Sequence, residues 1–128
     1  MSYFLLSDVK DVILQPLIDQ AIKEEVTSEI QSLARSKGVS PDYIPDITPF
    51  EVKMVAIAYA CYRVATYQAG SGSSNNFSGQ DQGDIFEKKA RMYYREYQDR
   101  ASSLTKELLM GVADEAQEYV VSMEIFRS

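Results

Sequence analysis

Apolar residues along much of the chain recur every three or four positions, which is the spacing of one face of an α-helix. The clearest stripe comprises Ile18, Ile22, Val26, Ile30 and Leu33, with steps of four, four, four and three. The charged residues of this stretch fall between the stripe positions, so the pattern predicts an amphipathic helix over roughly 17–37. Lys37 and Gly38 supply the usual signals of its C-terminal end.

The first residues predict a shorter element. An apolar run over residues 3–6 precedes Ser7, whose hydroxyl suits an N-cap. Asp8 then falls in the first turn, where a carboxylate is favoured by the helix dipole. We therefore expect a short helix over roughly 8–14, ending before Pro16 because proline disfavours the helical conformation of its predecessor.

The middle of the chain predicts a connector over 39–48, which holds two prolines, and then a helix from 49 to about 69. Thr48, Pro49 and Glu51 form the pattern of a capping box with proline at the first helical position. The predicted helix is apolar nearly all round, which is typical of a helix buried on most sides.

One chain of this size offers little other material to surround such a helix. Either the domain is centred on this one helix, or another subunit covers part of its surface. For the second alternative, the candidate subunit-packing residues are Tyr59, Tyr62 and Tyr67.

Residues 70–83, with the sequence GSGSSNNFSGQDQG, are predicted to form a flexible loop. A loop this long is usually functional or disordered, and its candidate interface residues are Asn75, Asn76 and Phe77. Residues 84–87 resemble another capping arrangement and predict the longest helix, over about 84–110, closed by Gly111. Its stripe keeps the heptad rhythm that suits antiparallel packing: Phe86, Ala90, Tyr93, Tyr97, Ala101, Leu104 and Leu108.

The last residues, 119–126, alternate apolar and polar side chains and predict a strand. No second strong strand pattern stands elsewhere in the sequence, and a lone strand leaves its backbone hydrogen-bonding groups unpaired. We therefore expect this segment to bind another chain through Tyr119, Val121, Met123, Ile125 and Phe126, although a frayed tail is the plainer alternative. The predicted fold is mainly α: a small antiparallel helical bundle over 1–111 with a C-terminal extended strand or arm over 112–128.

Length and composition limit the classes of function that this chain could have. The chain has 128 residues, which is the size of one domain, with no histidine and one cysteine. The missing histidine removes the commonest general base and zinc ligand, which disfavours enzyme chemistry. Cys61 lies inside the most apolar predicted helix, so we expect a core residue rather than a nucleophile. We assign no catalytic residue, no metal ligand and no cofactor. The single cysteine and the lack of a start-of-chain signal pattern indicate a reducing compartment.

The charge pattern disfavours nucleic-acid and membrane binding. The net charge is −6, and only residues 84–110 lean basic, with six basic and five acidic side chains. The tyrosines there, Tyr93, Tyr94 and Tyr97, could stack bases above a basic groove, but we expect Tyr93 and Tyr97 to belong to the core stripe. The longest apolar run has nine residues, against the roughly 20 needed to cross a bilayer, so a soluble protein is expected.

The order of elements is similar to that of a known family. FLLSDVKDVIL is followed by an amphipathic helix, a proline-rich connector, the tyrosine-rich EVKMVAIAYACYRVATYQAG, a Gly/Ser loop and DIFEKKARMYYREYQDRASSLTKELL. This layout, over roughly residues 3–110, resembles the head–tail connector (adaptor or head-completion) proteins of long-tailed bacteriophages. The resemblance lies in the order of the elements and their residue composition, and no diagnostic motif supports it.

The resemblance implies a structural virion protein of the phage neck, assembled in the bacterial cytoplasm. Such subunits form an oligomeric ring, usually of twelve copies, which joins the portal protein to the tail or the next neck protein. The ring extends the channel through which DNA passes without specific binding, and a C-terminal arm reaches toward the portal, here residues 119–128. The alternative is a cytosolic helical protein–protein interaction module, such as a homodimer. An enzyme or a nucleic-acid binder is the third possibility.

Overall fold

The computed structural model describes residues 2–70 and 77–111. In these ranges the chain is mainly helical, contains no strand, and has elements in the order η1 (Leu6–Asp8), η2 (Gln15–Leu17), α1 (Gln20–Ser36), η3 (Pro41–Tyr43), α2 (Phe50–Ala69), α3 (Phe77–Ser103) and α4 (Lys106–Met110). The elements marked η are single turns of 3-10 helix. The mainly helical fold class is therefore confirmed for this part of the chain.

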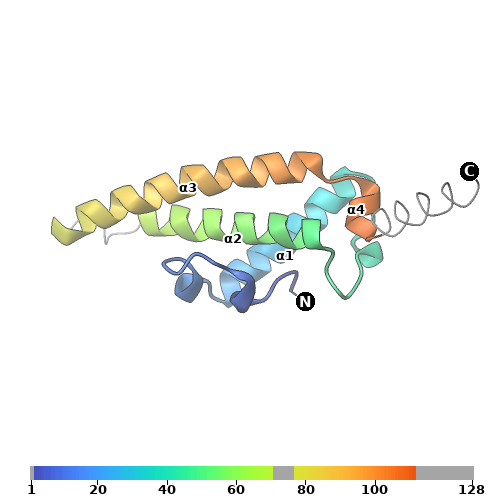
Figure 1. The fold of residues 1–128 in the computed structure, drawn as a ribbon, viewed down its shortest axis with the longest axis horizontal. Helices are drawn as coiled ribbons and strands as arrows, with labels where there is room; N and C mark the ends of the chain where they lie inside the picture. Colours follow the sequence, from blue (N-terminus) through green and yellow to red (C-terminus); the bar gives the residue numbers. More distant parts are fainter. Residues whose placement is uncertain (1, 71–76, 112–128) are drawn as a thin grey trace, which may run out of the picture.

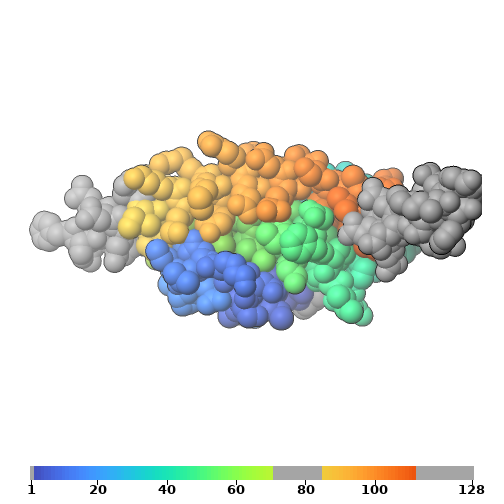
Figure 2. All heavy atoms as spheres, viewed as in Figure 1, coloured from blue at the N-terminus to red at the C-terminus, as the bar shows by residue number. Residues whose placement is uncertain are grey.

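Helices α2 and α3 run side by side in opposite directions along the long axis, and they make the most extensive helix–helix packing (Figure 1). Helix α1 packs obliquely against α2, and the N-terminal segment lies along another side of α2. Figure 2 shows α3 and the N-terminal segment on two sides of the central helix. The short helix α4 lies with η3 at the end of the molecule where α3 finishes.

The hydrophobic core is built around α2, which is buried along most of its length. Its buried residues are Val52, Val55, Ala56, Ala58, Ala60, Cys61, Val64 and Ala65. Many of them are small, which lets α1 and α3 approach the α2 backbone closely. The alternative of a domain centred on one helix therefore accounts for this buried surface within a single chain.

Helix α1 confirms the predicted amphipathic helix, with a start three residues later than expected. Asp19 acts as its N-cap, because the Asp19 carboxylate accepts a hydrogen bond from the Ile22 amide at 2.9 Å. The predicted stripe faces the core: Ile18, Ile22, Val26 and Ile30 are buried, and Leu33 packs against the core. Gly38 follows the helix with φ +84°, a left-handed conformation that favours glycine.

The predicted helix over 8–14 is wrong, since the N-terminal segment forms the 3-10 turns η1 and η2. Side chains there take over the hydrogen bonding that a helix would use. Asp8 accepts from the Leu5 amide at 2.9 Å, and Asp11 accepts from the amides of residues 13 and 14, both at 3.0 Å. The Gln15 amide group donates to the carbonyls of residues 6 and 9 at 2.7 and 3.1 Å.

The predicted capping box at the start of α2 is also wrong. The helix begins at Phe50, and Pro49 occupies the N-cap position with an extended ψ of 146° and no side-chain cap. Thr48 therefore lies one residue too early to cap the helix. The C-terminal end at Ala69, followed by Gly70, agrees with the prediction.

Helix α3 starts earlier and ends earlier than predicted. The expected loop over 70–83 is wrong from residue 77 onward, because α3 begins at Phe77 and passes through residues 84–87, which were expected to open the helix. A mid-helix glycine costs only about 1 kcal/mol, which does not stop a helix that is propagating from a well-packed region. Near the other end, the Thr105 hydroxyl accepts from the Leu108 amide at 3.1 Å and starts the separate helix α4.

The heptad stripe is confirmed across this break. Ala101 and Leu104 are buried, and the remaining members pack against the core: Phe86, Ala90, Tyr93, Tyr97 and Leu108. Gly111 ends α4 in the left-handed region, with φ +69°. The predicted strand over 119–126, and the proposed arm over 112–128, lie outside the described residues.

Candidate interaction surfaces

One cluster of polar and aromatic side chains ties α1 to α2. The Arg63 guanidinium donates to the Glu25 carboxylate at 2.9 Å and to the Tyr67 hydroxyl at 2.9 Å. The Tyr67 hydroxyl in turn donates to Glu25 at 2.7 Å, which closes a three-membered network. Burial favours the neutral guanidine, but the hydrogen bonds from Arg63 to Tyr67 and Glu25 outweigh it and raise the pKa of Arg63. Arg63 is therefore held charged in a structural role.

A second cluster stacks tyrosines between the helices. Tyr97 on α3 donates a short hydrogen bond to Glu29 on α1, and its ring lies 5.1 Å from the Tyr59 ring. The Tyr59 and Tyr62 rings are 5.8 Å apart, edge to face, and the Tyr62 and Tyr94 rings are 4.9 Å apart. Burial and the nearby Glu29 carboxylate raise the pKa of Tyr97 and of Tyr59. These rings belong to the packing between the three long helices.

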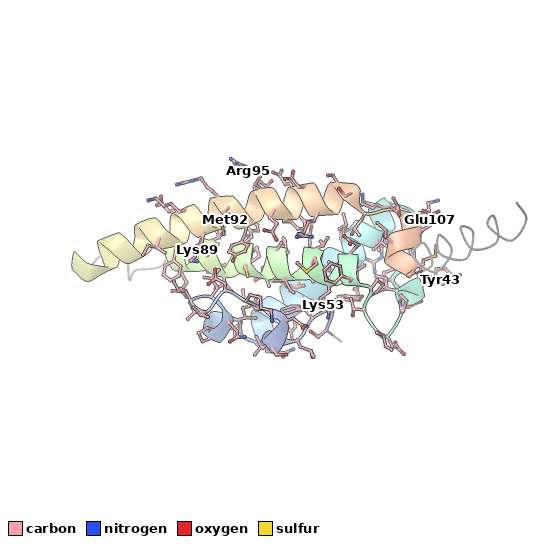
Figure 3. The ribbon with its side chains drawn as sticks, viewed as in Figure 1. Tyr43, Lys53, Lys89, Met92, Arg95 and Glu107 are labelled. Atoms are coloured by element: carbon pink, nitrogen blue, oxygen red, sulfur yellow. The ribbon has the colours of Figure 1, made fainter. Side chains whose placement is uncertain are left out.

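A third cluster fastens the N-terminal segment to α3. The Asp11 carboxylate accepts hydrogen bonds from the Lys89 ammonium and the Tyr93 hydroxyl, both at 2.7 Å. The Asp11 side chain is 7% exposed, and in Figure 3 Lys89 points from α3 toward the N-terminal segment. Burial alone raises the pKa of this carboxyl, but the bonds to Lys89 and Tyr93 outweigh it, so the pKa of Asp11 is lowered.

The candidate nucleophile and metal ligands in the sequence are its single cysteine and its carboxylates. Cys61 is buried in α2, and burial raises the pKa of its thiol to about 12, so the expectation of a core residue is confirmed. No group of three or more Cys, Asp or Glu side chains within 2–70 and 77–111 is placed to hold a metal ion. No helix in these ranges is long and apolar enough to span a bilayer.

Large apolar side chains are exposed at Tyr67, Ile85, Met92 and Tyr94 on α2 and α3, and in two sets nearer the N-terminal ends of the chain and of α2. The N-terminal set comprises Leu5, Leu6, Val12, Ile13 and Leu17. The connector set comprises Tyr43, Ile47 and Phe50, at the end of the molecule where Figure 3 labels Tyr43. Ile47 is 89% exposed and Val12 is 83% exposed, which leaves both nearly free of contacts within the chain. Exposed apolar side chains gathered on a folded domain are typical of contact surfaces.

Helix α1 borders a shallow groove with an acidic rim. The larger of two adjoining hollows has a volume of about 590 Å³ and is lined by Ala21, Glu24, Glu25, Ser28, Glu29, Ser32 and Tyr59. The smaller, of about 300 Å³, shares Ala21 and Glu25 with it and extends toward Leu17, Val64 and Tyr67. We call the two hollows together the α1 groove. Its floor is aromatic and aliphatic, and its rim carries carboxylates.

The outer face of α3 carries basic side chains, in contrast to the acidic rim of the α1 groove. Two basic residues one helical turn apart, Arg91 and Arg95, lie beside Met92, and all three are exposed. Arg95 makes no ion pair with the described residues, and Figure 3 shows it projecting from the side of α3 that faces away from α2. Arg91 has one weak partner, Glu87, at 3.9 Å. This face therefore presents two arginines with an apolar side chain beside them, and the carboxylates of Glu87 and Asp99 border it.

Some of the site residues predicted from the sequence lie within the described structure, and others lie outside it. Tyr59, Tyr62 and Tyr67 all lie in the inter-helix clusters, and Tyr67 also exposes nearly half of its surface. Phe77 is the first residue of α3. The two loop residues, Asn75 and Asn76, and the C-terminal candidates lie outside the described residues, so their roles stay predictions. Tyr93 and Tyr97 lie on the core side of α3, which confirms the core interpretation for both.

The carboxylates that these tyrosines bind were not among the residues predicted from the sequence. Glu25 and Glu29 are four residues apart beside the apolar stripe of α1, and that spacing signals a shared helix face. Asp11 gave no comparable signal, because its partner Lys89 lies 78 residues away in the chain.

Comparison with known proteins identified no relative of this chain: no family model, curated protein or solved structure matches it.

Proposed function

We propose that this chain is a structural virion protein of a bacteriophage neck, forming an oligomeric ring that joins the portal protein to the tail or the next neck protein and extends the DNA channel. The support from sequence is the order of elements described above. The antiparallel pair of α2 and α3, with α1 packed against it, is compatible with a small helical ring subunit. The proposal includes about twelve copies per ring and a C-terminal arm over 112–128 that binds the portal protein or a neighbouring subunit.

The observation that carries this proposal is the presence of two separate exposed apolar sets on one small, well-packed subunit. A subunit of a layered assembly needs a contact surface for each neighbour above and below it. The N-terminal set and the connector set supply two such surfaces, on different segments of the sequence. A simple two-fold dimer needs only one self-complementary surface.

The charges of the chain support a channel protein that does not retain DNA. The net charge is −6, which repels the phosphate backbone. Several cations are already paired within the chain, including Lys89 with Asp11 at 2.7 Å and Arg63 with Glu25 at 2.9 Å. A protein that lines or surrounds a DNA channel benefits from such a surface, because the DNA has to pass without binding.

The test is whether the chain is present in purified phage particles and in how many copies. We expect quantitative mass spectrometry of particles to find it at a constant ratio to the portal protein, and a particle reconstruction to place it as a ring beneath the portal. A monomer in the absence of other neck proteins is compatible with the proposal. Absence from purified particles contradicts it.

The second candidate is a cytosolic interaction module that acts as a homodimer. It is favoured by the connector set, because Tyr43, Ile47 and Phe50 are exposed on one short stretch of the chain, which suits one self-complementary contact. Deletion of residues 119–128 separates the two candidates. A dimer held through the connector set survives this deletion, whereas a neck protein that depends on its C-terminal arm loses attachment to its partner.

A further inference from the structure

The arginine pair on the outer face of α3 and the acidic rim of the α1 groove are opposite in charge and equal in spacing. Arg91 and Arg95 are one helical turn apart, and so are Glu25 and Glu29 on the groove rim. Residues four apart on a helix are separated by about 6 Å along its axis, so the two charge pairs have the same spacing. Met92 lies beside the two arginines and is 52% exposed, and the groove offers the Tyr59 ring as an apolar floor.

The groove carboxylates retain capacity for further hydrogen bonds. Glu25 accepts from Arg63 and Tyr67, and Glu29 accepts from Tyr97, but an ionised carboxylate has about four acceptor sites. Glu24 is exposed and makes no ion pair with the described residues. The nearest cation farther along this face of α1 is Arg35, beyond the groove. The groove therefore favours a cationic ligand with an apolar centre.

We propose that the outer face of α3 in one copy docks into the α1 groove of a second copy of this chain. Arg91 and Arg95 then face Glu24, Glu25 and Glu29 of the second copy, and Met92 contacts Tyr59. The same rigid helix cannot fold onto its own groove, since Arg95 projects away from α2 and the groove is lined by α1 and Tyr59. The occupant is therefore another molecule.

This contact joins two different surfaces, so each copy uses its α3 face toward one neighbour and its groove toward another. Such head-to-tail contacts close into a ring when the rotation between copies permits it. The inference rests on the proposed function, and it assigns the lateral contact within the ring. The two exposed apolar sets remain available for the neighbours above and below.

The test is the self-association of the full chain, measured by sedimentation velocity with charge-reversal variants. We expect the wild-type chain to self-associate, and to do so less at 1 M than at 0.1 M salt, where the screening length falls from about 10 to about 3 Å. Arg95→Glu and Glu24→Arg should each weaken association by roughly tenfold or more, because each places like charges opposite one another. The double variant should recover association, because the reversed charges attract again.

Two further variants control for net charge alone. Lys10→Glu and Asp46→Arg make the same charge changes at exposed positions outside both surfaces. We expect both to associate like the wild type. Far-UV circular dichroism checks that every variant keeps its helix content, which is expected because all four positions are exposed.

The inference is overturned if the wild-type chain stays monomeric at every concentration, if the single variants behave like their controls, or if the double variant fails to recover. Its failure is distinguishable from that of the proposed function. Particles that contain the chain as a ring and tolerate Arg95→Glu contradict the inference alone. Association through these two faces by a chain that is absent from particles contradicts the neck function alone.

Discussion

The N-terminal segment (residues 2–19) and the connector (residues 37–49) are both irregular, and both expose large apolar side chains, but they are attached to the helices in different ways. The N-terminal segment buries five apolar side chains, Tyr3, Phe4, Val9, Leu14 and Ile18. It also has the Asp11 anchor to α3. The connector buries two, Val39 and Ile44, and has no comparable charged anchor among its described contacts.

The difference indicates how an irregular segment becomes a fixed part of a fold. In the N-terminal segment, apolar burial and a fully bonded carboxylate act together. The connector is instead confined by backbone geometry and by close contact with the end of α4. A β-carbon at Gly111 would lie 3.2 Å from Pro45 Cγ and 3.3 Å from Pro49 Cγ. We therefore expect mutations to affect folding mainly in the first segment and at this single contact in the second.

The largest expected effect is from Leu14→Ala in the N-terminal segment. Leu14 is fully buried, so truncation removes its apolar contacts and leaves a cavity, at a cost of about 3 kcal/mol in the free energy of unfolding. Urea unfolding followed by circular dichroism measures this cost. Val12→Ala, at an exposed position two residues away, should change stability by less than about 0.5 kcal/mol. Equal effects of the two variants would show that the segment is not packed as described.

Asp11→Asn should have the second largest effect, a loss of about 2 kcal/mol in the free energy of unfolding. The change leaves the Lys89 ammonium and the Tyr93 hydroxyl without their charged partner. Thermal unfolding should show a decrease in Tm of several degrees. Asp8→Asn is the matched control in the same segment. Its ion pair with Lys53 is long, at 3.7 Å, and partly exposed, so we expect a much smaller loss.

At the contact between α4 and the connector, Gly111→Ala should cost about 1.5 kcal/mol in the free energy of unfolding. Alanine is strained at φ +69°, and its methyl group would press against both prolines. Gly70→Ala is the control, since Gly70 has φ −87° and only the Thr66 carbonyl oxygen near, at 3.5 Å. The control should be neutral or slightly stabilising, because alanine restricts the unfolded chain. The two variants are compared by denaturant midpoint.

The contrast between these segments also explains which parts of the fold could be predicted from sequence. The stripes of α1 and α3 are local patterns, and nearly every member lies on the core side as expected. A helix was wrongly predicted over residues 8–14, between the turns η1 and η2. The side-chain bonds of Asp11 that replace it depend on the docking of this segment on α3, which the local sequence does not reveal. The start of α3 was missed because glycine and serine suggest a loop wherever they gather, although each costs a helix little.

The candidate surfaces were less predictable than the fold. The tyrosines of α2 were identified from sequence, but their carboxylate partners depend on how α1 packs across α2. The exposure of Ile47 and Val12 is likewise a tertiary property, since both stand in apolar runs that could equally be buried. The match between the α1 groove and the outer face of α3 requires the spatial positions of residues about 65 apart in sequence.

Lowering the pH should reduce the difference in unfolding free energy between the wild type and Asp11→Asn. The pKa of Asp11 is lowered in the folded state, so the unfolded chain takes up this proton first as the pH falls. The stability from Asp11 is therefore present above its unfolded pKa, near 4, and is lost as the pH falls through the folded value. Chemical unfolding between about pH 6 and 2.5 measures this. A difference that stays constant over this range would contradict the charged anchor.

The smallest expected effect on folding comes from Ile47→Ser in the connector set, and it is the most informative about function. Ile47 is 89% exposed, so the change should shift the unfolding free energy by no more than about 0.5 kcal/mol. Val12→Ser is the matched change in the N-terminal set. If each set contacts a different neighbour, each variant should be depleted from purified particles although it folds normally. Depletion of neither variant would remove the two-surface argument for a layered assembly, and depletion of only one would leave the other set without a partner in the neck.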